Sequence, residues 1–264
     1  MVKSQYAERV AWITGASAGI GRALAIELAR QGASVAVSGR RRDRLEEVAA
    51  AIEAEGGRGL AMPCDVTDEA SVAAASSEVA SHFGRLDLAI ANAGFAVRGR
   101  VSELTADDWR RQLDTNVVGA AVTARCALPE LEKTGGRLVL VGSVVAMISA
   151  PKSAAYAASK AALRALGQTL AAELHGTGVS VTTVHPGYVE SEIGQVDRLG
   201  RFDPSRQDRR PARLMWPADR AARSILRAAA RRKREHVFTA HGKLAGYLGR
   251  HAPGLVHLAV TRRR

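Results

Sequence analysis

The chain has 264 residues, of which 47% are hydrophobic and only 4% aromatic, and its formal net charge is +12. This length and apolar content fit one α/β domain with a large core, which Ala, Val and Leu must fill. No apolar run is long enough for a membrane-spanning helix, and the first residues do not resemble a signal peptide. Cys64 and Cys126 lack metal-ligand spacing and are interpreted as free thiols. We therefore expect a cytoplasmic protein without a metal site.

The positive charge is concentrated in the last quarter of the chain. Residues 194–264 contain 18 Lys and Arg against 5 Asp and Glu, whereas residues 1–193 contain 20 against 21. Such asymmetry favours an anionic partner, which would be a membrane surface, a nucleic acid or an acidic substrate. A solvated Arg-rich surface is the alternative. No nucleic-acid motif or set of stacking aromatic residues accompanies the charge, so we expect no nucleic-acid partner.

Short apolar strands alternate with Ala-rich helices along the first two thirds of the chain. Strands are predicted over 9–14, 34–39, 59–64, 86–92, 136–143 and 179–186. Helices are predicted over 19–31, 42–55, 68–82, 107–131 and 154–175. Alternation of this kind is typical of right-handed βαβ units, and strands that are apolar throughout indicate a parallel sheet covered on both faces. We predict an α/β fold with a single doubly wound Rossmann-type domain over 1–264 and a central sheet of about seven strands.

The alternation weakens after the sixth strand. Residues 188–216 are rich in Pro and charged side chains, and we predict that they form a substrate lid, because a long aperiodic segment in a compact domain is usually functional or disordered. A helix is predicted over 218–233 and a last strand over 235–240. Residues 241–264 form a basic and apolar C-terminal extension with broken helical periodicity. This extension suggests weak peripheral membrane contact, and packing on its own domain or on a partner subunit is the alternative.

Gly15, Gly19 and Gly21 lie between the first strand and the first helix. Glycines permit a tight turn and close approach to a pyrophosphate, whose charge the free N–H groups of a helix N-terminus stabilise. The spacing is G-x-x-x-G-x-G and differs from the general dinucleotide fingerprint G-x-G-x-x-G. The strand–turn–helix context nevertheless favours nucleotide binding over simple packing, and we assign Ser17 and Ile20 to the same cofactor turn.

The second strand ends without the carboxylate that usually binds the ribose hydroxyls of NAD. Gly39 stands at that position, and Arg40 and Arg41 follow it. Because a 2′-phosphate needs Arg, these residues indicate NADP(H) rather than NAD(H), with a solvated Arg run as the alternative. After the third strand, Asp65 and Val66 are candidates for the adenine end, although Asp65 would also suit the start of the next helix.

A series of short motifs resembles the short-chain dehydrogenase/reductase family across at least residues 8–240. In chain order the motifs are Thr14-Gly15-x-x-x-Gly19-x-Gly21, Asp65-Val66, Asn92-Ala93-Gly94, Asn116 in "DTNVVG", Ser143 in "VGSVVA", Tyr156-x-x-x-Lys160 and Pro186-Gly187. Each motif is weak alone, but seven of them at compatible spacings in one α/β chain are hard to obtain by chance. Ala18 departs from the family, because many members that prefer NADP have Arg or Lys at this position.

The resemblance implies a catalytic set of Asn116, Ser143, Tyr156 and Lys160. Tyr156 would be the general acid/base at the substrate oxygen. Lys160, one helical turn away, would favour the phenolate and hold the nicotinamide ribose. Ser143 would hydrogen-bond the substrate oxygen as charge develops on it. Asn116 would hold a water linking Lys160 to solvent, and an Asn bonded to its own helix backbone is the alternative.

The resemblance also assigns residues to the cofactor and the substrate. Beyond the glycine turn, the cofactor would contact Asn92, Ala93, Gly94, Tyr156, Lys160, Pro186, Gly187, Val189 and Ser191. The substrate would contact Ser143, Val145, Tyr156 and Tyr188. The residues around these positions are largely apolar, which favours a hydrophobic ketone or alcohol over a sugar.

The sequence therefore predicts an NADP(H)-dependent oxidoreductase that interconverts a small-molecule ketone and a secondary alcohol by hydride transfer. The alternatives are a non-catalytic dinucleotide-binding scaffold and a membrane-surface binding protein on the same fold. Presence of both Tyr156 and Lys160 argues against the scaffold. Because members of the family commonly associate through their two long helices, we expect a homodimer or a homotetramer.

Overall fold

The computed structural model describes residues 5–148, 150–208 and 210–261. Within these ranges the strands are β1 (Val10–Thr14), β2 (Ser34–Gly39), β3 (Arg58–Pro63), β4 (Leu88–Ala91), β5 (Arg137–Val141), β6 (Ser180–His185) and β7 (Glu235–Val237). They form one sheet in the order β3-β2-β1-β4-β5-β6-β7, and every neighbouring pair is parallel. The prediction of a doubly wound parallel sheet is confirmed.

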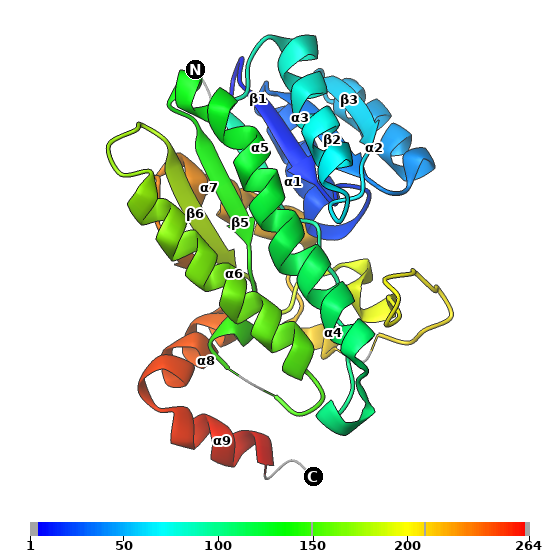
Figure 1. The fold of residues 1–264 in the computed structure, drawn as a ribbon, viewed down its shortest axis with the longest axis vertical. Helices are drawn as coiled ribbons and strands as arrows, with labels where there is room; N and C mark the ends of the chain where they lie inside the picture. Colours follow the sequence, from blue (N-terminus) through cyan, green and yellow to red (C-terminus); the bar gives the residue numbers. More distant parts are fainter. Residues whose placement is uncertain (1–4, 149, 209, 262–264) are drawn as a thin grey trace.

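Helices cover both faces of this sheet (Figure 1). In the described ranges they are α1 (Gly19–Arg30), α2 (Arg42–Ala54), α3 (Glu69–Phe83), α4 (Ala106–Leu113), α5 (Gly119–Thr134), α6 (Ala154–Glu173), α7 (Ala218–Ala230), α8 (Ala240–His251) and α9 (Pro253–Thr261). Ile13 packs with the core under α1, α2 and α7, whereas its neighbour Trp12 packs with the core under α3, α5 and α6. Successive residues of a strand point to opposite faces, so two apolar cores explain why the strands are apolar throughout.

The strand order places a crevice at the carboxyl end of the sheet. The chain leaves β1 towards β2 on one side, and β4 returns to the other side of β1. Connections that leave in opposite directions open a gap between them, which is where α/β folds of this type bind ligands. The glycine turn after β1 and the Asn92–Gly94 loop after β4 both lie at this gap.

The helix predicted over 107–131 is present, but it contains a π-type turn that the sequence did not indicate. The chain forms α4, then a wide π-type turn over Asp114–Val118, and then α5. The π-turn contains Asn116, whose side chain is bonded to a neighbouring loop and to α6 rather than exposed. Such turns widen the helix by one residue and often occur at functional sites.

The C-terminal extension folds into two helices separated at Pro253. The predicted strand over 235–240 ends early at Val237, because Thr239 turns the chain with φ 72° and caps α8 by accepting a hydrogen bond from Gly242 N. In Figure 1, α8 lies at the carboxyl end of the sheet and α9 projects beyond it. None of the helices in the described ranges is both long enough and apolar enough to cross a bilayer.

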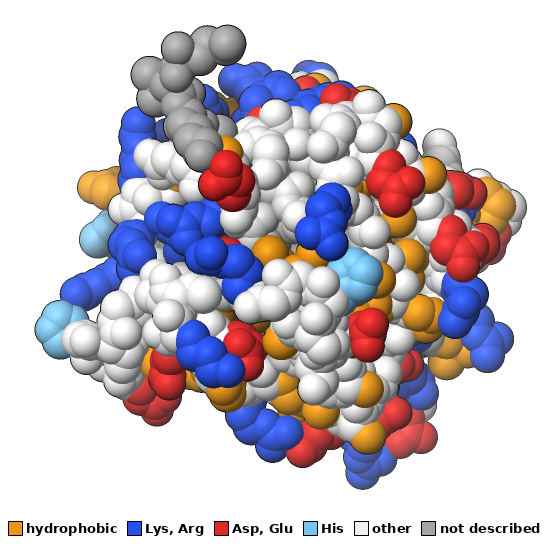
Figure 2. All heavy atoms as spheres, turned by 90° about the horizontal axis from the view of Figure 1, so that it is seen from above, with side chains coloured by type: hydrophobic (Ala, Val, Ile, Leu, Met, Phe, Trp, Pro, Cys, Tyr) orange, Lys and Arg blue, Asp and Glu red, His pale blue; other side chains and the backbone are white. Residues whose placement is uncertain are grey.

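These two helices expose four large apolar side chains, which we call the apolar side of the extension. They are Leu244, Tyr247, Leu255 and Leu258. α8 packs on β7 and on the turn Val144–Ala146, so this part of the extension does rest on its own domain. Membrane contact through the apolar side stays a prediction. At the opposite end of the molecule, Lys and Arg side chains are interspersed with Asp and Glu rather than gathered into one field (Figure 2).

Candidate active site

The glycine turn is packed tightly between two other loops. Gly15 and Gly19 adopt left-handed backbone conformations, with φ 65° and 54°. A Cβ on Gly15 would lie 2.6 Å from Ala93 Cα, and one on Gly19 would lie 2.8 Å from Ser191 Cβ. Only glycine fits both the dihedral angles and the contacts. The structure thus brings the predicted cofactor residues after β1, β4 and β6 together.

Asn92 ties the glycine turn to the end of β4. Its Nδ2 donates hydrogen bonds to the carbonyl oxygens of Thr14 and Gly15, both at 3.0 Å. The Thr14 hydroxyl in turn accepts from the backbone N–H groups of Asn92 and Ala93. Gly21 is required for this contact, because a Cβ there would lie 2.6 Å from Asn92 Nδ2. These bonds give the turn a fixed shape before any ligand binds.

Arg40 is exposed and Arg41 is half-buried, and both make specific contacts. The Nε and Nη2 atoms of Arg41 donate to Ser17 Oγ in the glycine turn, at 3.2 and 2.9 Å. Arg41 Nη2 also lies 2.8 Å from a carboxylate oxygen of Glu192. Arg40 Nη2 donates to the carbonyl oxygen of Gly200 at 2.8 Å. Both arginines therefore stand at the mouth of the turn and contact the segment predicted to be a lid.

Ser143, Tyr156 and Lys160 converge at the carboxyl end of β5. Tyr156 and Lys160 both lie on α6, with Lys160 Nζ 5.9 Å from the centroid of the Tyr156 ring. Ser143 follows β5 and lies near enough to the Tyr156 phenol to lower its pKa, and Val145 N donates to Ser143 Oγ at 3.4 Å. Lys160 Nζ donates to the carbonyl oxygen of Val141 at 2.8 Å.

Burial shifts the ionisation of both α6 side chains. It raises the pKa of the Tyr156 phenol, and the hydrogen bond to Ser143 opposes part of that rise. It lowers the pKa of the Lys160 ammonium to about 8. Both shifts follow from the cost of holding a charge away from water.

Asn116 is held between a loop and α6. Its Nδ2 donates to the carbonyl oxygen of Phe95 at 3.1 Å and to Ser159 Oγ at 3.0 Å, and its Oδ1 accepts from Phe95 N at 3.1 Å. Gly94 permits this approach, because a Cβ there would lie 3.0 Å from Asn116 Oδ1 and 3.6 Å from Lys160 Nζ. The side chain therefore does not bond to its own helix backbone, which was the alternative interpretation.

Two residues that the sequence did not single out support this arrangement. Gln112 Nε2 donates to the carbonyl oxygen of Phe95 at 2.9 Å, and Gln112 Oε1 accepts from Val97 N at 2.6 Å. Ser159 accepts from Asn116 and donates to the carbonyl oxygen of Tyr156 at 2.7 Å. Polar residues at these helical positions resemble any solvated helix face, so no sequence signal separated them.

Arg210 fixes the loop after β6. Its side chain is only 7% exposed, and its guanidinium donates to the carbonyl oxygens of Val189 and Ser191 at 2.8 and 2.7 Å. It is also paired with Asp208 at 2.7 Å. The sequence places Arg210 among many arginines in an aperiodic segment and does not distinguish it. This residue keeps Ser191 against the glycine turn.

The remaining predicted site residues lie nearer the edge of the site. Asp65 Oδ1 accepts from the N–H and hydroxyl of Thr67, at 3.0 and 2.8 Å, so its contacts suit the turn before α3. Val66 is buried, and a Cβ on Gly119 would lie 2.8 Å from it. Tyr188 is exposed, and its ring stacks on that of His241 in α8, with centroids 5.4 Å apart.

Three further predicted cofactor residues, Ile20, Pro186 and Gly187, pack against neighbouring elements. Ile20 packs against the core under α1. Pro186 accepts a hydrogen bond from Val144 N at 2.9 Å, which joins the loop after β6 to the loop after β5. Gly187 lies against α8, since a Cβ there would collide with His241 Nε2 and Thr239 Oγ1. The two loops and α8 are therefore in direct contact beside the site.

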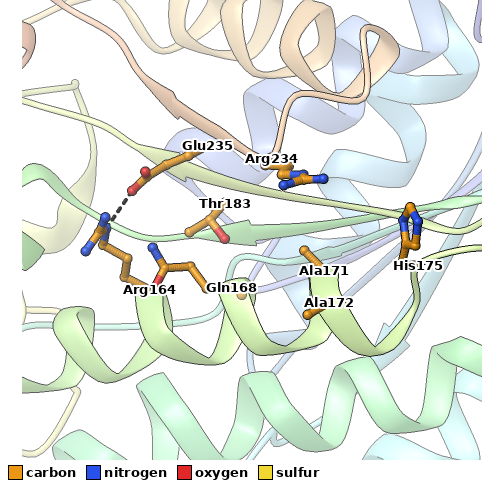
Figure 3. A pocket seen from close by; sticks show the side chains of 9 residues that line it. Arg164, Gln168, Ala171, Ala172, His175, Thr183, Arg234 and Glu235 are labelled. Atoms are coloured by element: carbon orange, nitrogen blue, oxygen red, sulfur yellow. Dashed lines mark hydrogen bonds and ion pairs between the residues drawn. The ribbon is translucent and has the colours of Figure 1, made fainter.

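A charged cluster lies behind Ser143. Glu235 in β7 is paired with Arg164 and Arg250, both at 2.6 Å, and the Arg164 pair is visible in Figure 3. Its carboxylate also lies 2.9 Å from His185 Nε2, and His185 Nδ1 lies 3.1 Å from the carbonyl oxygen of Ser143. The bond from His185, followed by that from Arg164, holds the pKa of the Glu235 carboxyl well below its usual range.

Two grooves lie outside this arrangement. One of about 580 Å³ runs between α6 and the last two strands, lined by residues such as Gln168 and Thr183 (Figure 3). Neither Ser143 nor Tyr156 lines it. The other, of about 400 Å³, lies between Met147, Ile148 and the helices α8 and α9, and its lining is mostly apolar. The second groove begins only a few residues beyond Ser143.

Comparison with known proteins gives consistent matches. The family model for short chain dehydrogenases matches residues 9–200. Over 193 residues the chain is 35% identical to a 3beta-hydroxysteroid dehydrogenase of Mediterraneibacter gnavus, covering 73% of this chain and 70% of that protein. It is 41% identical over 196 residues to 11-beta-hydroxysteroid dehydrogenase 1A of Arabidopsis thaliana, covering 71% of this chain but only 54% of that protein.

A solved structure extends the likeness beyond the region that the family model matches. The alcohol dehydrogenase from the archaeon Thermococcus sibiricus, complexed with 5-hydroxy-NADP, superimposes with a TM-score of 0.76 at 28% identity. The alignment covers 88% of this chain and 96% of that one. The chain therefore belongs to the short-chain dehydrogenase/reductase family and is an NAD(P)-dependent oxidoreductase of alcohol and carbonyl groups.

Proposed function

We propose that this enzyme uses NADP(H) to interconvert a hydrophobic ketone and a secondary alcohol, with Tyr156 as the general acid/base. The observation that carries the proposal is the convergence of Ser143, Tyr156 and Lys160 beside the glycine turn. A non-catalytic scaffold would not need a half-buried phenol beside a buried ammonium, because desolvating these groups costs free energy.

The glycine turn fits a dinucleotide. The residue that precedes α1 is Ala18, whose side chain cannot cap the helix, and the first turn of α1 contains no acidic residue. The first N–H groups of α1 therefore face a site where a phosphate would accept their hydrogen bonds. Gly15, Gly19 and Ser17 would line the diphosphate, and Arg40 and Arg41 would hold a 2′-phosphate. When bound, the cofactor supplies or accepts the hydride.

The protein side chains would handle the proton and the charge on the substrate oxygen. In reduction, Tyr156 Oη donates its proton to that oxygen, while Ser143 Oγ donates a hydrogen bond to it. The Lys160 ammonium stabilises the phenolate that remains. Because burial raises the pKa of Tyr156, the phenol of the free enzyme carries at neutral pH the proton that reduction requires.

Asn116 is proposed to position these groups. Its side chain fixes the loop at Phe95 and bonds to Ser159, which lies between Tyr156 and Lys160 on α6. A water held beside Asn116 would complete a proton path from Lys160 to solvent.

An apolar substrate suits a groove next to the site. This 400 Å³ groove is not lined by the catalytic residues, but it begins at Met147 and Ile148, shortly after Ser143, and its other side includes Pro253 and Val256. Burial of an apolar ligand surface in such a groove is favourable by about 25 cal/mol per Å². The names of two relatives, hydroxysteroid dehydrogenases, describe enzymes of rigid apolar alcohols, and we infer a ketone or alcohol of comparable hydrophobicity here.

A homo-oligomer would bury the outer face of α6. This face exposes the small side chains of Ala158, Ala161 and Ala165, which lie about one turn apart. Small residues allow a second helix to approach closely, so we infer that copies of the chain associate here as a dimer or a tetramer.

Arg41→Ala should weaken the binding of NADPH but not that of NADH. We expect the Kd for NADPH to rise by about tenfold, because a hydrogen bond between charged groups contributes about 1.5–3 kcal/mol, while the Kd for NADH stays nearly constant. Isothermal titration calorimetry of both cofactors measures this directly. Arg42→Ala is the matched control, since Arg42 is mostly exposed and its nearest carboxylate partner is Glu46 at 3.9 Å. An equal loss for both cofactors would reject the phosphate role.

The rate of ketone reduction should fall as pH rises above about 8. The pKa of Lys160 in the free enzyme is about 8, so its ammonium is present below that pH and lost above it. The pKa of Tyr156 is raised, so the phenol loses its proton only at higher pH. The pH profile of kcat/KM reports groups of the free enzyme and should show this fall. A profile that stays flat to about pH 9.5, with thermal melts showing an intact fold, would contradict the assignment of Lys160.

A further inference from the structure

Both arginines of the proposed phosphate site are already engaged by one segment of the lid. Arg41 Nη2 is paired with Glu192 Oε2 at 2.8 Å, and the Arg41 guanidinium lies 5.8 Å from the centroid of the Phe202 ring. Arg40 Nη2 donates to the carbonyl oxygen of Gly200 at 2.8 Å. We call residues 192–202 the clamp segment. Its contacts cover the two guanidinium groups that a 2′-phosphate would need.

The Glu192 carboxylate is the charged part of this contact. It meets the same guanidinium that donates two hydrogen bonds to Ser17 in the glycine turn. The side chains of Arg41 and Glu192 are 33% and 30% exposed, so water screens the pair only partly. A carboxylate and a phosphate ester both bind a guanidinium through two oxygens in one plane. Glu192 therefore presents to Arg41 the kind of group that the cofactor would present.

The backbone around Glu192 is held in place rather than free to swing. The preceding residue, Ser191, packs against Gly19, and its carbonyl oxygen accepts from the buried Arg210 at 2.7 Å. The other end of the clamp segment is closed by a bridge between Val196 and Phe202 and by Asp197 Oδ1, which accepts from two backbone N–H groups in the turn. Glu192 is thus one residue beyond an anchored position, which places its carboxylate within reach of Arg41.

We propose that Glu192 is a specificity-determining residue whose carboxylate competes with the 2′-phosphate of NADP(H) for Arg41. The inference rests on the proposed use of NADP(H). Binding of NADP(H) replaces the carboxylate on the guanidinium and so releases the clamp segment from Arg41. NAD(H) carries no 2′-phosphate and leaves the Glu192–Arg41 pair intact. Glu192 therefore reduces the difference in affinity between NADP(H) and NAD(H) that the two arginines create.

The test is cofactor binding to Glu192→Gln, which keeps the shape of the side chain and removes its charge. Partly exposed ion pairs are weak, so we expect the Kd for NADPH to fall by about three- to fivefold while the Kd for NADH stays nearly constant. Calorimetric titration at about 0.05 M salt limits screening of the pair. Glu190→Gln is the matched control, because Glu190 is exposed and carries the same charge two residues earlier. It should change neither Kd.

A double-mutant cycle tests whether Glu192 affects NADPH binding through Arg41. In an Arg41→Ala background, Glu192→Gln should no longer strengthen NADPH binding, because the two groups act through one guanidinium. If Arg41→Ala weakens NADPH binding but Glu192→Gln behaves like Glu190→Gln, or weakens NADPH binding, the competition is disproved and the NADP(H) function stands. If Arg41→Ala leaves NADPH binding unchanged, the proposed cofactor role itself is wrong.

Discussion

Tyr156→Phe should lower kcat/KM for ketone reduction by about 10³-fold, within the range of about 10² to 10⁴ typical for loss of a general acid. The Tyr156 phenol carries a proton next to Ser143, and Phe keeps the ring while removing that proton donor. The Kd for NADPH should change by no more than about twofold, because the hydroxyl acts on the substrate oxygen. Stopped-flow absorbance of NADPH oxidation and calorimetric titration measure the two quantities.

Tyr247→Phe provides the control for removing a phenolic hydroxyl. Tyr247 is 63% exposed on α8 and its ring packs beside His251, away from Ser143. This variant should turn over at the wild-type rate. If Tyr156→Phe retained turnover within about tenfold of the wild type, Tyr156 would not be the proton donor.

Gly15→Ala should destabilise the fold by about 2–5 kcal/mol and eliminate measurable cofactor binding. Ala in a left-handed conformation costs about 1–2 kcal/mol. A further cost of about 1–3 kcal/mol arises from overpacking, because the new Cβ would lie 2.6 Å from Ala93 Cα, a backbone atom that cannot rotate away. Thermal unfolding should show a fall in Tm of about 2–4 °C for each kcal/mol.

Gly56→Ala measures the backbone cost of a left-handed Ala without the cost of overpacking. Gly56 has φ 81°, and a Cβ there would have nothing within 4 Å. It therefore bears the backbone cost alone, and cofactor binding should be unchanged. Equal falls in Tm for Gly15→Ala and Gly56→Ala would show that the turn can move away from Ala93, and the fixed shape described for the glycine turn would be wrong.

Local patterns in the sequence were sufficient for the sheet and for the residues that meet at its carboxyl end. The inner strands were recognised without knowledge of their partners, because they are buried on both faces and so are mostly apolar. Tyr156 and Lys160 were placed together by helical spacing alone, since four residues make one turn. The carboxyl ends of parallel strands share one edge, so the order of motifs along the chain was enough to bring Gly15, Asn92 and Ser143 to that edge.

The sequence was insufficient wherever a contact joins distant residues without a periodic signal. Arg40 and Gly200 are separated by 160 positions. No pattern marks Glu192 or Arg210 among the other charges of the lid. The π-turn at Asn116 was missed for a related reason. Asn116 in this turn bonds to Phe95 and Ser159, and a helix-forming sequence gives no indication of such contacts.

The charged cluster around Glu235 affects how the end of the chain should be handled in the laboratory. Arg250 in α8 is joined through Glu235 and His185 to the carbonyl oxygen of Ser143. Truncating the chain before α8 would therefore remove a counterion of Glu235 along with the exposed leucines. Loss of lipid binding and loss of turnover would then coincide for unrelated reasons. Point substitutions at Leu255 and Leu258, which leave Arg250 in place, keep the question of membrane contact separate from the integrity of the enzyme.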